Sequence, residues 1–465
     1  MKRALLFLAI VSLVMLNLEA SDAQSKVLTF DDAVKIASQN SVLLNQQKNN
    51  LDYSQMQRMQ SIASAGPSVS LNSSASQFNG NSFNPNTGRV TNGVRDNVTG
   101  SINANINLFS GLNRINSIRQ FNSQLDAQSY FVSRTAQDVI NTVATQYLTV
   151  MLDMELLKIA RENFDAQDKQ RLQIREQLAL GARSQVDEYN QDALAKAAEL
   201  RLVQAEINLN NDKTLLTQTL LMDPFEQYDV EKPAWDLSAL GYDNLNLEEL
   251  TEKAKLHRGD YLRAVKNEEA LRFGTKAAKG LMMPSLYAFG NYGSAYNFQH
   301  DVPDSITFGG ATIKNPDTPR PFAEQFRTNN AYKSYGFQLN IPVFGGLQNR
   351  TTYTQQKVLH ENSQWTRKSL EYQIKNDVIR AVRNYEGAKK AYGVSTDQLR
   401  AADLAFQLET ERYNLGVTNF VDYTNANRVL VQSQTDKAQA EYRLVFQRIL
   451  IEYAVGTLKA EDFQQ

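Results

Sequence analysis

The sequence of 465 residues contains no cysteine and only three histidines, His257, His300 and His360. Without cysteine the chain forms no disulfide, zinc ribbon or iron–sulfur cluster, and it has no thiol nucleophile. The histidines lie far apart, and no zinc-protease, serine-hydrolase, phosphate-loop or dinucleotide motif is present. The sequence therefore predicts a protein that is not an enzyme and has no metal or cofactor.

An excess of charge of one sign is also missing. The 49 Lys and Arg residues nearly balance the 50 Asp and Glu residues, which leaves a net charge of −1. This balance gives no reason to expect nucleic acid as a partner. The mean hydropathy is −0.45, and beyond the N-terminus no apolar run is long enough for a transmembrane helix.

The N-terminus has the pattern of a secretory signal peptide. Lys2 and Arg3 precede an apolar run from Ala4 to Leu18, and Ser21 and Ala23 place small residues at a cleavage site. We therefore expect a signal peptide over residues 1–23 and export of the remaining chain.

The rest of the chain is an internal duplication. The segment Ile106–Leu112 resembles Ile341–Leu347 at a shift of 235 positions, and Leu180–Asp187 resembles Leu415–Asp422 at the same shift. Upstream matches have a shift of only 217, so repeat two carries about 18 extra residues. They fall in a segment rich in Gly, Pro, Asn and Asp, residues 297–330, which predicts a long exposed loop.

The duplication divides the mature chain into repeats over 24–244 and 245–465. Each repeat is expected to contain short helices, two strands, a very long helix, a turn at glycine and a shorter helix. The predicted strands cover about 68–78, 98–109, 285–296 and 332–344. The predicted long and shorter helices cover 112–180 and 184–221 in the first repeat, and 347–415 and 419–455 in the second.

Two of the predicted strands alternate between apolar and polar residues. Val98, Ile102 and Ile106 alternate with asparagine and other polar residues, and the strand that begins at Tyr332 has the same period. A period of two over about ten residues is typical of a barrel wall with one face to lipid and one to water. An ordinary half-buried sheet in a soluble domain is the alternative.

Four strands are too few to close a barrel, for which about eight is the practical minimum. An open sheet cannot lie in lipid, because the hydrogen-bonding groups at its edges would be unpaired. Several chains must therefore pool their strands. Two copies would supply eight strands and three would supply twelve.

The long helices favour three copies. Each predicted helix of this kind contains no proline and would be roughly 100 Å long at 1.5 Å per residue. Each carries only a narrow apolar stripe, as in a coiled coil. Such helices can form a tube around a lumen, and twelve strands leave a wider lumen than eight. The expected fold is mainly α, with an α-barrel tunnel and four strands per chain that contribute to a trimeric, 12-stranded transmembrane β-barrel.

These residues resemble the TolC-like outer membrane efflux proteins over nearly the whole mature chain. The strand-to-helix junctions carry the resemblance through Phe109 and Gly111 in repeat one and Phe344 and Gly346 in repeat two. The helix–turn–helix segments 180–187 and 415–422 are equally specific.

The resemblance implies a homotrimer in the outer membrane of a Gram-negative bacterium, with an extension into the periplasm. It implies a passive exit duct for small molecules, drugs or proteins. These would come from an inner-membrane pump of the RND or ABC type, through a periplasmic adaptor (a membrane fusion protein).

The resemblance also assigns candidate roles at the periplasmic tip. Asp187, Asp422 and Asn425 would line the aperture and influence ion selectivity. Asp187 follows Ser184 by three residues and Asp422 follows Asn419 by three, which is also the spacing of a helix-capping box. Structural capping and a selectivity role both remain open.

The neighbouring positions are candidates for closing the tip. Arg183, Tyr413 and Thr418 would make the gate contacts. Gly181 and Gly416 are expected to end the long helices in left-handed caps, on turns where an adaptor would dock.

Two other classes of function compete with the duct. A periplasmic or surface coiled-coil spacer or adhesin, without a pore, would explain the helices but not the alternating strands. A secreted hydrolase with paired carboxylates has no pocket-forming motif to support it.

Overall fold

The computed structural model describes residues 26–84, 89–226, 228–232, 246–300, 302–315 and 318–459. The predicted signal peptide, residues 1–23, lies outside the described residues. The chain forms two compact units. The helical unit contains Met1–Leu51, Gln128–Arg263 and Arg367–Gln465, and the sheet unit contains Asp52–Ala127 and Ala264–Thr366. Among the described helices, none is both long and apolar enough to cross a membrane.

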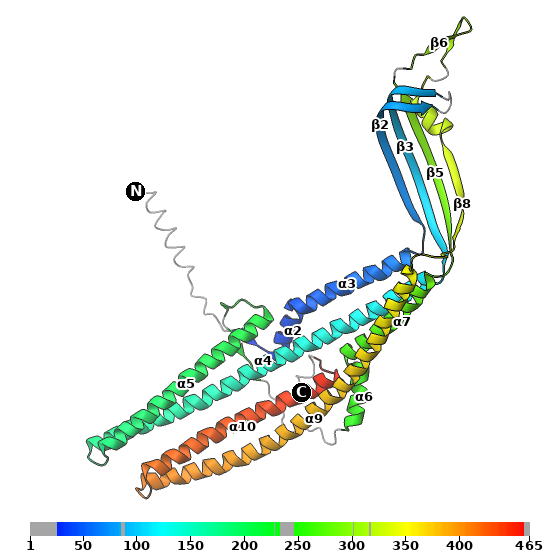
Figure 1. Ribbon diagram of the computed structural model, residues 1–465. Helices are drawn as coiled ribbons and strands as arrows, with labels where there is room; N and C mark the ends of the chain where they lie inside the picture. Colours follow the sequence, from blue (N-terminus) through cyan, green and yellow to red (C-terminus); the bar gives the residue numbers. More distant parts are fainter. Residues whose placement is uncertain are drawn as a thin grey trace, which may run out of the picture. The chain divides into compact units, whose positions relative to one another are not determined.

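Antiparallel helices dominate the helical unit (Figure 1). The long helix α4 (Asn113–Ala179) is followed by α5 (Gln185–Leu220), and α9 (Gln348–Asn414) is followed by α10 (Phe420–Val455). The shorter helices α2 (Phe30–Asn40) and α6 (Leu247–His257) also belong to this unit. The remaining helices α3 (Val42–Ala63) and α7 (Gly259–Gly280), like α4 and α9, continue into the sheet unit.

Polar side chains begin several of these helices. The hydroxyl of Thr29 accepts a hydrogen bond from the backbone N–H of Asp32 at the start of α2. The side chain of Asn246 accepts hydrogen bonds from Glu248 and Glu249 at the start of α6. Each cap satisfies backbone groups that a helix N-terminus leaves unpaired.

The core of the helical unit is centred on Tyr147 of α4, whose side chain is fully buried. Its hydroxyl lies 3.0 Å from the carbonyl oxygen of Leu28 and 2.8 Å from that of Glu231. These carbonyls flank a parallel pair of short strands, β1 (Lys26–Leu28) and β4 (Tyr228–Val230), which the sequence did not predict. Tyr147 thereby connects both ends of repeat one.

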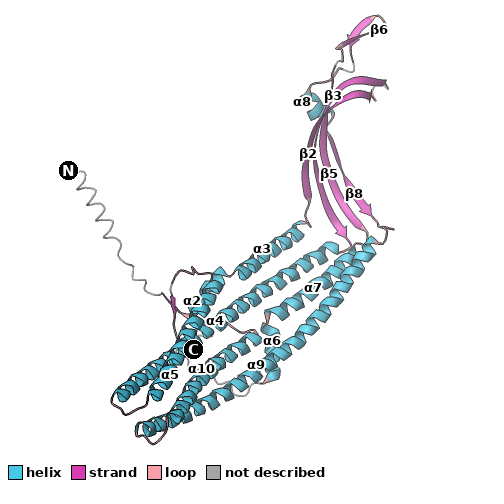
Figure 2. Cartoon of the chain, turned by 60° about the vertical axis from the view of Figure 1, so that its left-hand side comes forward, coloured by secondary structure: helices cyan, strands magenta, loops and turns pink. Residues whose placement is uncertain are grey.

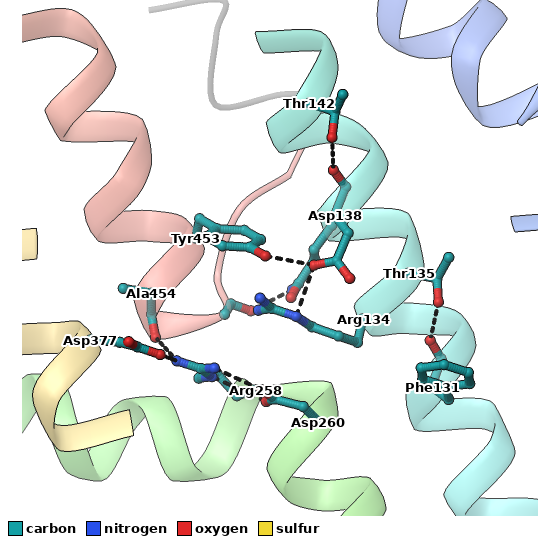
Figure 3. A network of polar contacts seen from close by, with 12 residues as sticks. Phe131, Arg134, Thr135, Asp138, Thr142, Arg258, Asp260, Asp377, Tyr453 and Ala454 are labelled. Atoms are coloured by element: carbon teal, nitrogen blue, oxygen red, sulfur yellow. Dashed lines mark hydrogen bonds and ion pairs between the residues drawn. The ribbon is translucent and has the colours of Figure 1, made fainter. Parts of the chain in front are cut away.

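A second polar connection lies where α6 ends and α7 begins (Figure 3). Arg258, only 3% exposed, donates hydrogen bonds to Asp260 over 2.6 Å and to Asp377 of α9 over 3.0 Å. On α4, Asp138 accepts hydrogen bonds from Arg134 over 2.9 Å and from Tyr453 of α10 over 2.7 Å. These two clusters connect helices of both repeats.

The main sheet of the sheet unit is antiparallel and four-stranded, with the strand order β2–β3–β5–β8 (Figure 2). The strands are β2 (Ser68–Asn84), β3 (Arg89–Ser110), β5 (Ser285–Gln299) and β8 (Tyr332–Asn340). The duplicated, mainly helical fold with these four strands in one sheet confirms the predicted architecture of the chain.

The register places apolar and polar residues on opposite faces. Ile102 lies opposite Tyr292 and Ile106 opposite Ala288, while Asn103 lies opposite Asn291 on the other face. A bulge at Leu108 separates this regular pairing from the junction with α4.

The strand limits differ from the predicted ones. Strand β2 continues to Asn84, beyond its predicted end at 78, and strand β3 begins at Arg89, before its predicted start at 98. Polar residues with weak alternation continue the pairing of the two strands over these added positions. Strand β8 ends at Asn340, four residues before its predicted end. Pro342 has no N–H to donate to a ladder, so the strand stops before it.

Residues 297–330 were predicted as a long exposed loop, and most of the described ones are exposed, but they also form short regular elements. They contain the hairpin β6 (Ser305–Phe308) and β7 (Ala311–Lys314), the turn α8 (Phe322–Glu324) and the π-helical turn η1 (Gln325–Asn329). The turn η1 packs on the sheet, where the Ser294 hydroxyl donates to the carbonyl of Phe326 over 2.6 Å. The ring of Phe326 fills the space over Gly100. A Cβ at Gly100 would lie only 2.9 Å from this ring, so the contact needs a residue without a side chain.

Candidate aperture at the helix turns

The two long helices end in the same backbone motif. Gly181 and Gly416 have φ of 73° and 71°, in the left-handed region that glycine adopts without a steric penalty. The N–H groups of Gly181 and Ala182 bond back to Leu178 and Gln177, and those of Gly416 and Val417 bond to Tyr413 and Arg412. This is the Schellman pattern, which satisfies the last carbonyls of a helix.

The helices after these turns begin with an acid-assisted cap. The Ser184 hydroxyl accepts a hydrogen bond from the N–H of Asp187 over 3.2 Å, and the Asp187 carboxylate accepts one from the N–H of Ser184 over 3.1 Å. In repeat two, Asn419 accepts from the N–H of Asp422 over 2.9 Å. Both acids therefore lie in the first turn of a helix, where the dipole favours negative charge.

Thr418 and Asn425 lie near the second cap. The Thr418 hydroxyl donates to the Asp422 carboxylate over 3.2 Å, so Thr418 contacts the acid of the same turn. Asn425 is exposed on α10, one turn beyond Asp422. The predicted aperture residues of repeat two are thus neighbours in space.

Tyr413 lies in a buried aromatic cluster beside the turn. It is only 2% exposed, and its ring stacks on Tyr423 at a centroid distance of 5.0 Å. Phe420 lies 6.2 Å from Tyr413, and Phe406 lies 5.7 Å from Tyr423. Burial raises the pKa of Tyr413 despite the opposing charge of Arg183, so this phenol stays neutral at physiological pH.

Arg183 connects the turn of repeat one to this cluster in repeat two. Its guanidinium carbon lies 4.5 Å from the centre of the Tyr413 ring, within the range of a cation–π interaction. Its Nε donates to Gln177 over 3.2 Å, which fixes the guanidinium. Within the described chain, the buried Tyr413 hydroxyl has no hydrogen-bond partner of acceptable geometry. The contact therefore acts through the ring face.

The sequence analysis did not identify the aromatic partners or a buried amide pair farther from the turn. Gln191 of α5 is completely buried and donates to the backbone and side-chain oxygens of Gln167 on α4, over 3.0 and 2.9 Å. Helical spacing along α9 was the available signal for Phe406 and Tyr413, whereas Tyr423 lies on α10. No local pattern marks a lone buried glutamine.

The strand-to-helix junctions also repeat in conformation. Gly111 and Leu112 have φ of 60° and 64°, and Gly346 and Leu347 have φ of 59° and 65°. The Gly111 backbone lies against Gly280, so that a Cβ at Gly111 would be 2.4 Å from the Gly280 oxygen. Phe109 and Phe344 precede these glycines and are 44% and 84% exposed. Gly111 is therefore required both for its φ and for close packing.

Among the residues that the structure describes, no group of three or more His, Cys, Asp or Glu side chains is arranged to hold a metal ion. The chemistry of the helix turns is that of exposed carboxylates, capped helices and one arginine–aromatic contact. Such a set can influence the passage of ions and hold two helical hairpins together.

Known structures share this fold. The outer membrane protein VceC from Vibrio cholerae matches with a TM-score of 0.76 and 15% identity, over 92% of this chain and 96% of that chain. The CmeC outer membrane channel of Campylobacter jejuni matches with a TM-score of 0.76 and 14% identity, over 93% and 88%. The open state of the Neisseria gonorrhoeae MtrE outer membrane channel gives 0.72 and 16%, over 93% and 90%. No sequence among the curated proteins matches this chain.

The chain thus has the fold of these outer membrane channels. The family model for the outer membrane efflux protein matches residues 33–220 and 265–457, and the chain belongs to this family. The protein is therefore a non-enzymatic efflux channel of the outer membrane of Gram-negative bacteria, with a tunnel in the periplasm.

Proposed function

We propose that the protein is the exit duct of a tripartite export system. Three copies assemble, and the trimer receives small molecules, drugs or proteins from an inner-membrane pump of the RND or ABC type through a periplasmic adaptor. The duct is passive, since the pump supplies the energy. The open-edged sheet with one apolar face is the observation that carries this proposal.

The sheet supports a pooled barrel because β2 and β8 each have one unpaired edge among the described strands. In a bilayer, unpaired backbone groups cost several kcal/mol each, so the edges need partners. Strand β8 of one copy supplies a partner for β2 of the next, and three copies give twelve strands. The polar face with Asn103, Asn105 and Asn291 then surrounds water.

The helices support assembly through rows of exposed apolar side chains. Burial of such rows against another copy removes apolar surface from water and favours association. These residues are Leu200, Val203 and Ile207 on α5, which are 70%, 45% and 47% exposed, and Trp365, Tyr372, Val394, Leu404 and Leu408 on α9, all more than half exposed.

We infer that the helix turns form the periplasmic aperture. In a trimer, Asp187 and Asp422 contribute six carboxylates to one opening, which favours cations over anions. Asn425 adds a polar, uncharged position to the same lining. The position of the two acids in the first turns of α5 and α10 is compatible with this, because the helix dipole favours negative charge there.

The proposed gate is the contact between Arg183 and Tyr413, with Thr418 as a support for Asp422. Because this contact joins the turn of repeat one to the last turn of α9, its loss frees the two hairpins to separate. Gly181 and Gly416 shape the turns on which the adaptor docks. Phe109, Gly111, Phe344 and Gly346 set the junctions between strands and long helices.

The test is planar-bilayer conductance of the purified mature protein, with its mass measured in detergent. We expect a trimer with small, cation-selective channels and a loss of selectivity in the double variant Asp187→Asn/Asp422→Asn. The control is Glu226→Gln, an exposed acid in the turn after α5. A monodisperse, water-soluble monomer without conductance would instead support the coiled-coil spacer.

Coupling to a pump needs a separate experiment. We expect an affinity-tagged protein to co-purify with an adaptor after cross-linking in its host, and variants with a bulky residue at Gly181 or Gly416 to lose the cross-link. Intact trimers that conduct ions but retain no adaptor in the wild type would contradict the tripartite assignment while leaving the channel in place.

A further inference from the structure

A cavity of about 550 Å³ lies between α4, α5 and α10 in the helical unit. This volume is in the range of pockets that hold small molecules. Three charged side chains line the cavity, Asp153, Arg201 and Arg428, and apolar side chains such as Leu156 and Val431 form another part of its wall. The described residues of the helix turns do not line it, so the cavity is separate from the proposed aperture.

The acid of this cavity has an unused acceptor atom. Asp153 of α4 is only 9% exposed, and its buried Oδ2 has no hydrogen-bond partner within the described chain. Buried polar atoms in proteins are nearly always hydrogen-bonded, because a buried acceptor without a donor is costly. A ligand that donates a hydrogen bond into the cavity at this point would satisfy the atom.

The two arginines of the cavity are available to an anion. Arg201 of α5 and Arg428 of α10 are both exposed. Within the described residues, neither forms a hydrogen bond or an ion pair. A guanidinium group keeps its charge at physiological pH and donates two parallel hydrogen bonds to a carboxylate. These side chains therefore favour a ligand that carries a carboxylate.

The helix register places Arg428 at the opposite end of the cavity from Asp153. The side-chain amide of Asn427 on α10 donates to Asn163 of α4 over 3.4 Å, so the next residue, Arg428, lies near the level of Asn163. Asn163 also lines the cavity. Asp153 precedes Asn163 along α4 by roughly 15 Å, at a rise of 1.5 Å per residue. The acid and this arginine are therefore well separated along the helix axis.

Arg201 lies toward the same end as Arg428. Helix α5 runs antiparallel to α4 (Figure 1), and Glu206 of α5 pairs with Arg161 of α4 over 3.3 Å. Because Arg201 precedes Glu206 on the antiparallel helix, it lies farther than Glu206 from the level of Asp153. The cavity thus has an acid at one end, two guanidinium groups toward the other, and apolar side chains in its wall.

We propose that this cavity binds an elongated zwitterion, with a protonated amine on the Asp153 carboxylate and a carboxylate on Arg201 and Arg428. An ammonium group has three donors and no acceptor, so it matches the buried Oδ2. The apolar part of the ligand contacts the apolar wall, which includes Leu156 and Val431. All three helices belong to one chain, so the site does not depend on the proposed export function.

Calorimetric titration tests the site with ω-amino acids of graded chain length as probes. The protein is the purified, mature trimer in detergent. We expect an optimum length, because only a chain that spans the cavity brings its ammonium group to the acid and its carboxylate to the arginines. Alkylamines and alkanoates of that length carry one charge each. They should bind at least about tenfold more weakly, since each lacks the hydrogen bonds of one charged group.

Variants of the two ends should give a crossed pattern. Asp153→Asn and Arg428→Gln should each weaken binding of the best ω-amino acid at least about tenfold. Asp153→Asn should leave binding of the alkanoate unchanged, and Arg428→Gln should leave binding of the alkylamine unchanged. A variant that simply folds poorly would lose both. The matched controls are Asp165→Asn on α4 and Arg443→Gln on α10, which change exposed residues outside the cavity and should retain wild-type affinity.

Three results would overturn the proposal. The first is the absence of binding at every chain length. The second is equal affinity for the ω-amino acid and the alkylamine of the same length, because the arginines would then contribute nothing. The third is binding to a dissociated monomer but not to the trimer, which would show that a second copy covers the cavity. Bilayer conductance is measured separately, so a conducting trimer without ligand binding would reject this site and retain the proposed duct.

Discussion

Leu221 and Gly456 close the second helix of each repeat at equivalent positions, and both adopt left-handed backbone angles, with φ of 51° and 80°. The residues after them bond back to Thr217 and Glu452 in the same Schellman pattern. The left-handed residue is therefore a leucine in repeat one and a glycine in repeat two. The environments explain part of the difference, because Leu221 is 54% exposed whereas a Cβ at Gly456 would lie 2.8 Å from the Arg258 nitrogen.

This pair predicts opposite effects of reciprocal substitutions. Leu221→Gly should raise the free energy of unfolding by up to about 1 kcal/mol, because a left-handed non-glycine residue is strained by more than the added chain entropy of glycine costs. Gly456→Leu should lower it by more than about 1 kcal/mol, through strain and through the clash with Arg258. Thermal unfolding followed by helical circular dichroism compares the two; destabilisation by Leu221→Gly would contradict the assignment of strain.

Arg258→Met should be among the most destabilising single changes in the helical unit. It leaves the half-buried Asp260 without its charged partner and leaves Asp377 with only the exposed Arg380. Removal of one partner of a buried ion pair costs up to about 3 to 5 kcal/mol. The measurement is chemical unfolding of the detergent-solubilised protein. Arg380→Met is the matched control, since Arg380 contacts Asp377 over 3.4 Å from an exposed position.

The same ion pair predicts a loss of stability in acid. Burial alone would raise the pKa of Asp260, but the hydrogen bonds and charge of Arg258 outweigh burial and hold it below 3.8. A lowered folded-state pKa contributes stability that is present above pH 3.8 and is lost as the pH falls through the folded value. Unfolding curves of the wild type between pH 2 and 5 should therefore show a decline that Arg258→Met lacks.

Tyr413→Phe distinguishes a ring contact from a hydroxyl contact at the proposed gate. Because the buried Tyr413 hydroxyl forms no hydrogen bond of acceptable geometry within the described chain, its removal should leave stability unchanged or raise it by about 1 kcal/mol. Arg183→Ala removes the cation–π contact and should increase open-channel conductance. Increased conductance in Tyr413→Phe equal to that of Arg183→Ala would mean that the hydroxyl is bonded in the assembled channel.

The junction glycines predict unequal effects of the same substitution. Gly111→Ala places a Cβ 2.4 Å from the Gly280 oxygen, whereas a Cβ at Gly346 meets no atom of the described residues within 4 Å. Both positions have positive φ, so Gly346→Ala should cost about 1 kcal/mol. Gly111→Ala should cost several times more and reduce the yield of folded protein. The yield of heat-resistant oligomer on gels compares the two variants.

The main elements were predictable because each is long enough to repeat a pattern many times. The stripe on α4 and the alternation along β3 use only the local period of the backbone, and the duplication doubles each signal. The short strands β1 and β4 have three residues each and lie far apart in sequence, so no periodicity indicates them. Their pairing depends on Tyr147, a contact that only the folded chain creates.

At the helix turns, the local backbone conformation was predictable but the side-chain contacts were not. Gly181 and Asp187 follow from turn and cap spacing. The stacking of Arg183 on Tyr413 joins residues of two repeats, and a single sequence contains no information on such a pair. The same limit applies to Arg258, which appears in the sequence as one charged residue among many at a helix break.

The matched helix lengths of the two repeats restrict which insertions and deletions the helices can accept. The helices α4 and α9 have 67 residues each, and α5 and α10 have 36 each. One residue inserted into α4 alone would turn all later side chains by about 100° and move them by about 1.5 Å, so that Gln167 would no longer face Gln191. A change of seven residues nearly restores the face. Lineages of this protein should therefore differ in tunnel length by whole heptads, gained or lost in pairs on the helices that pack together.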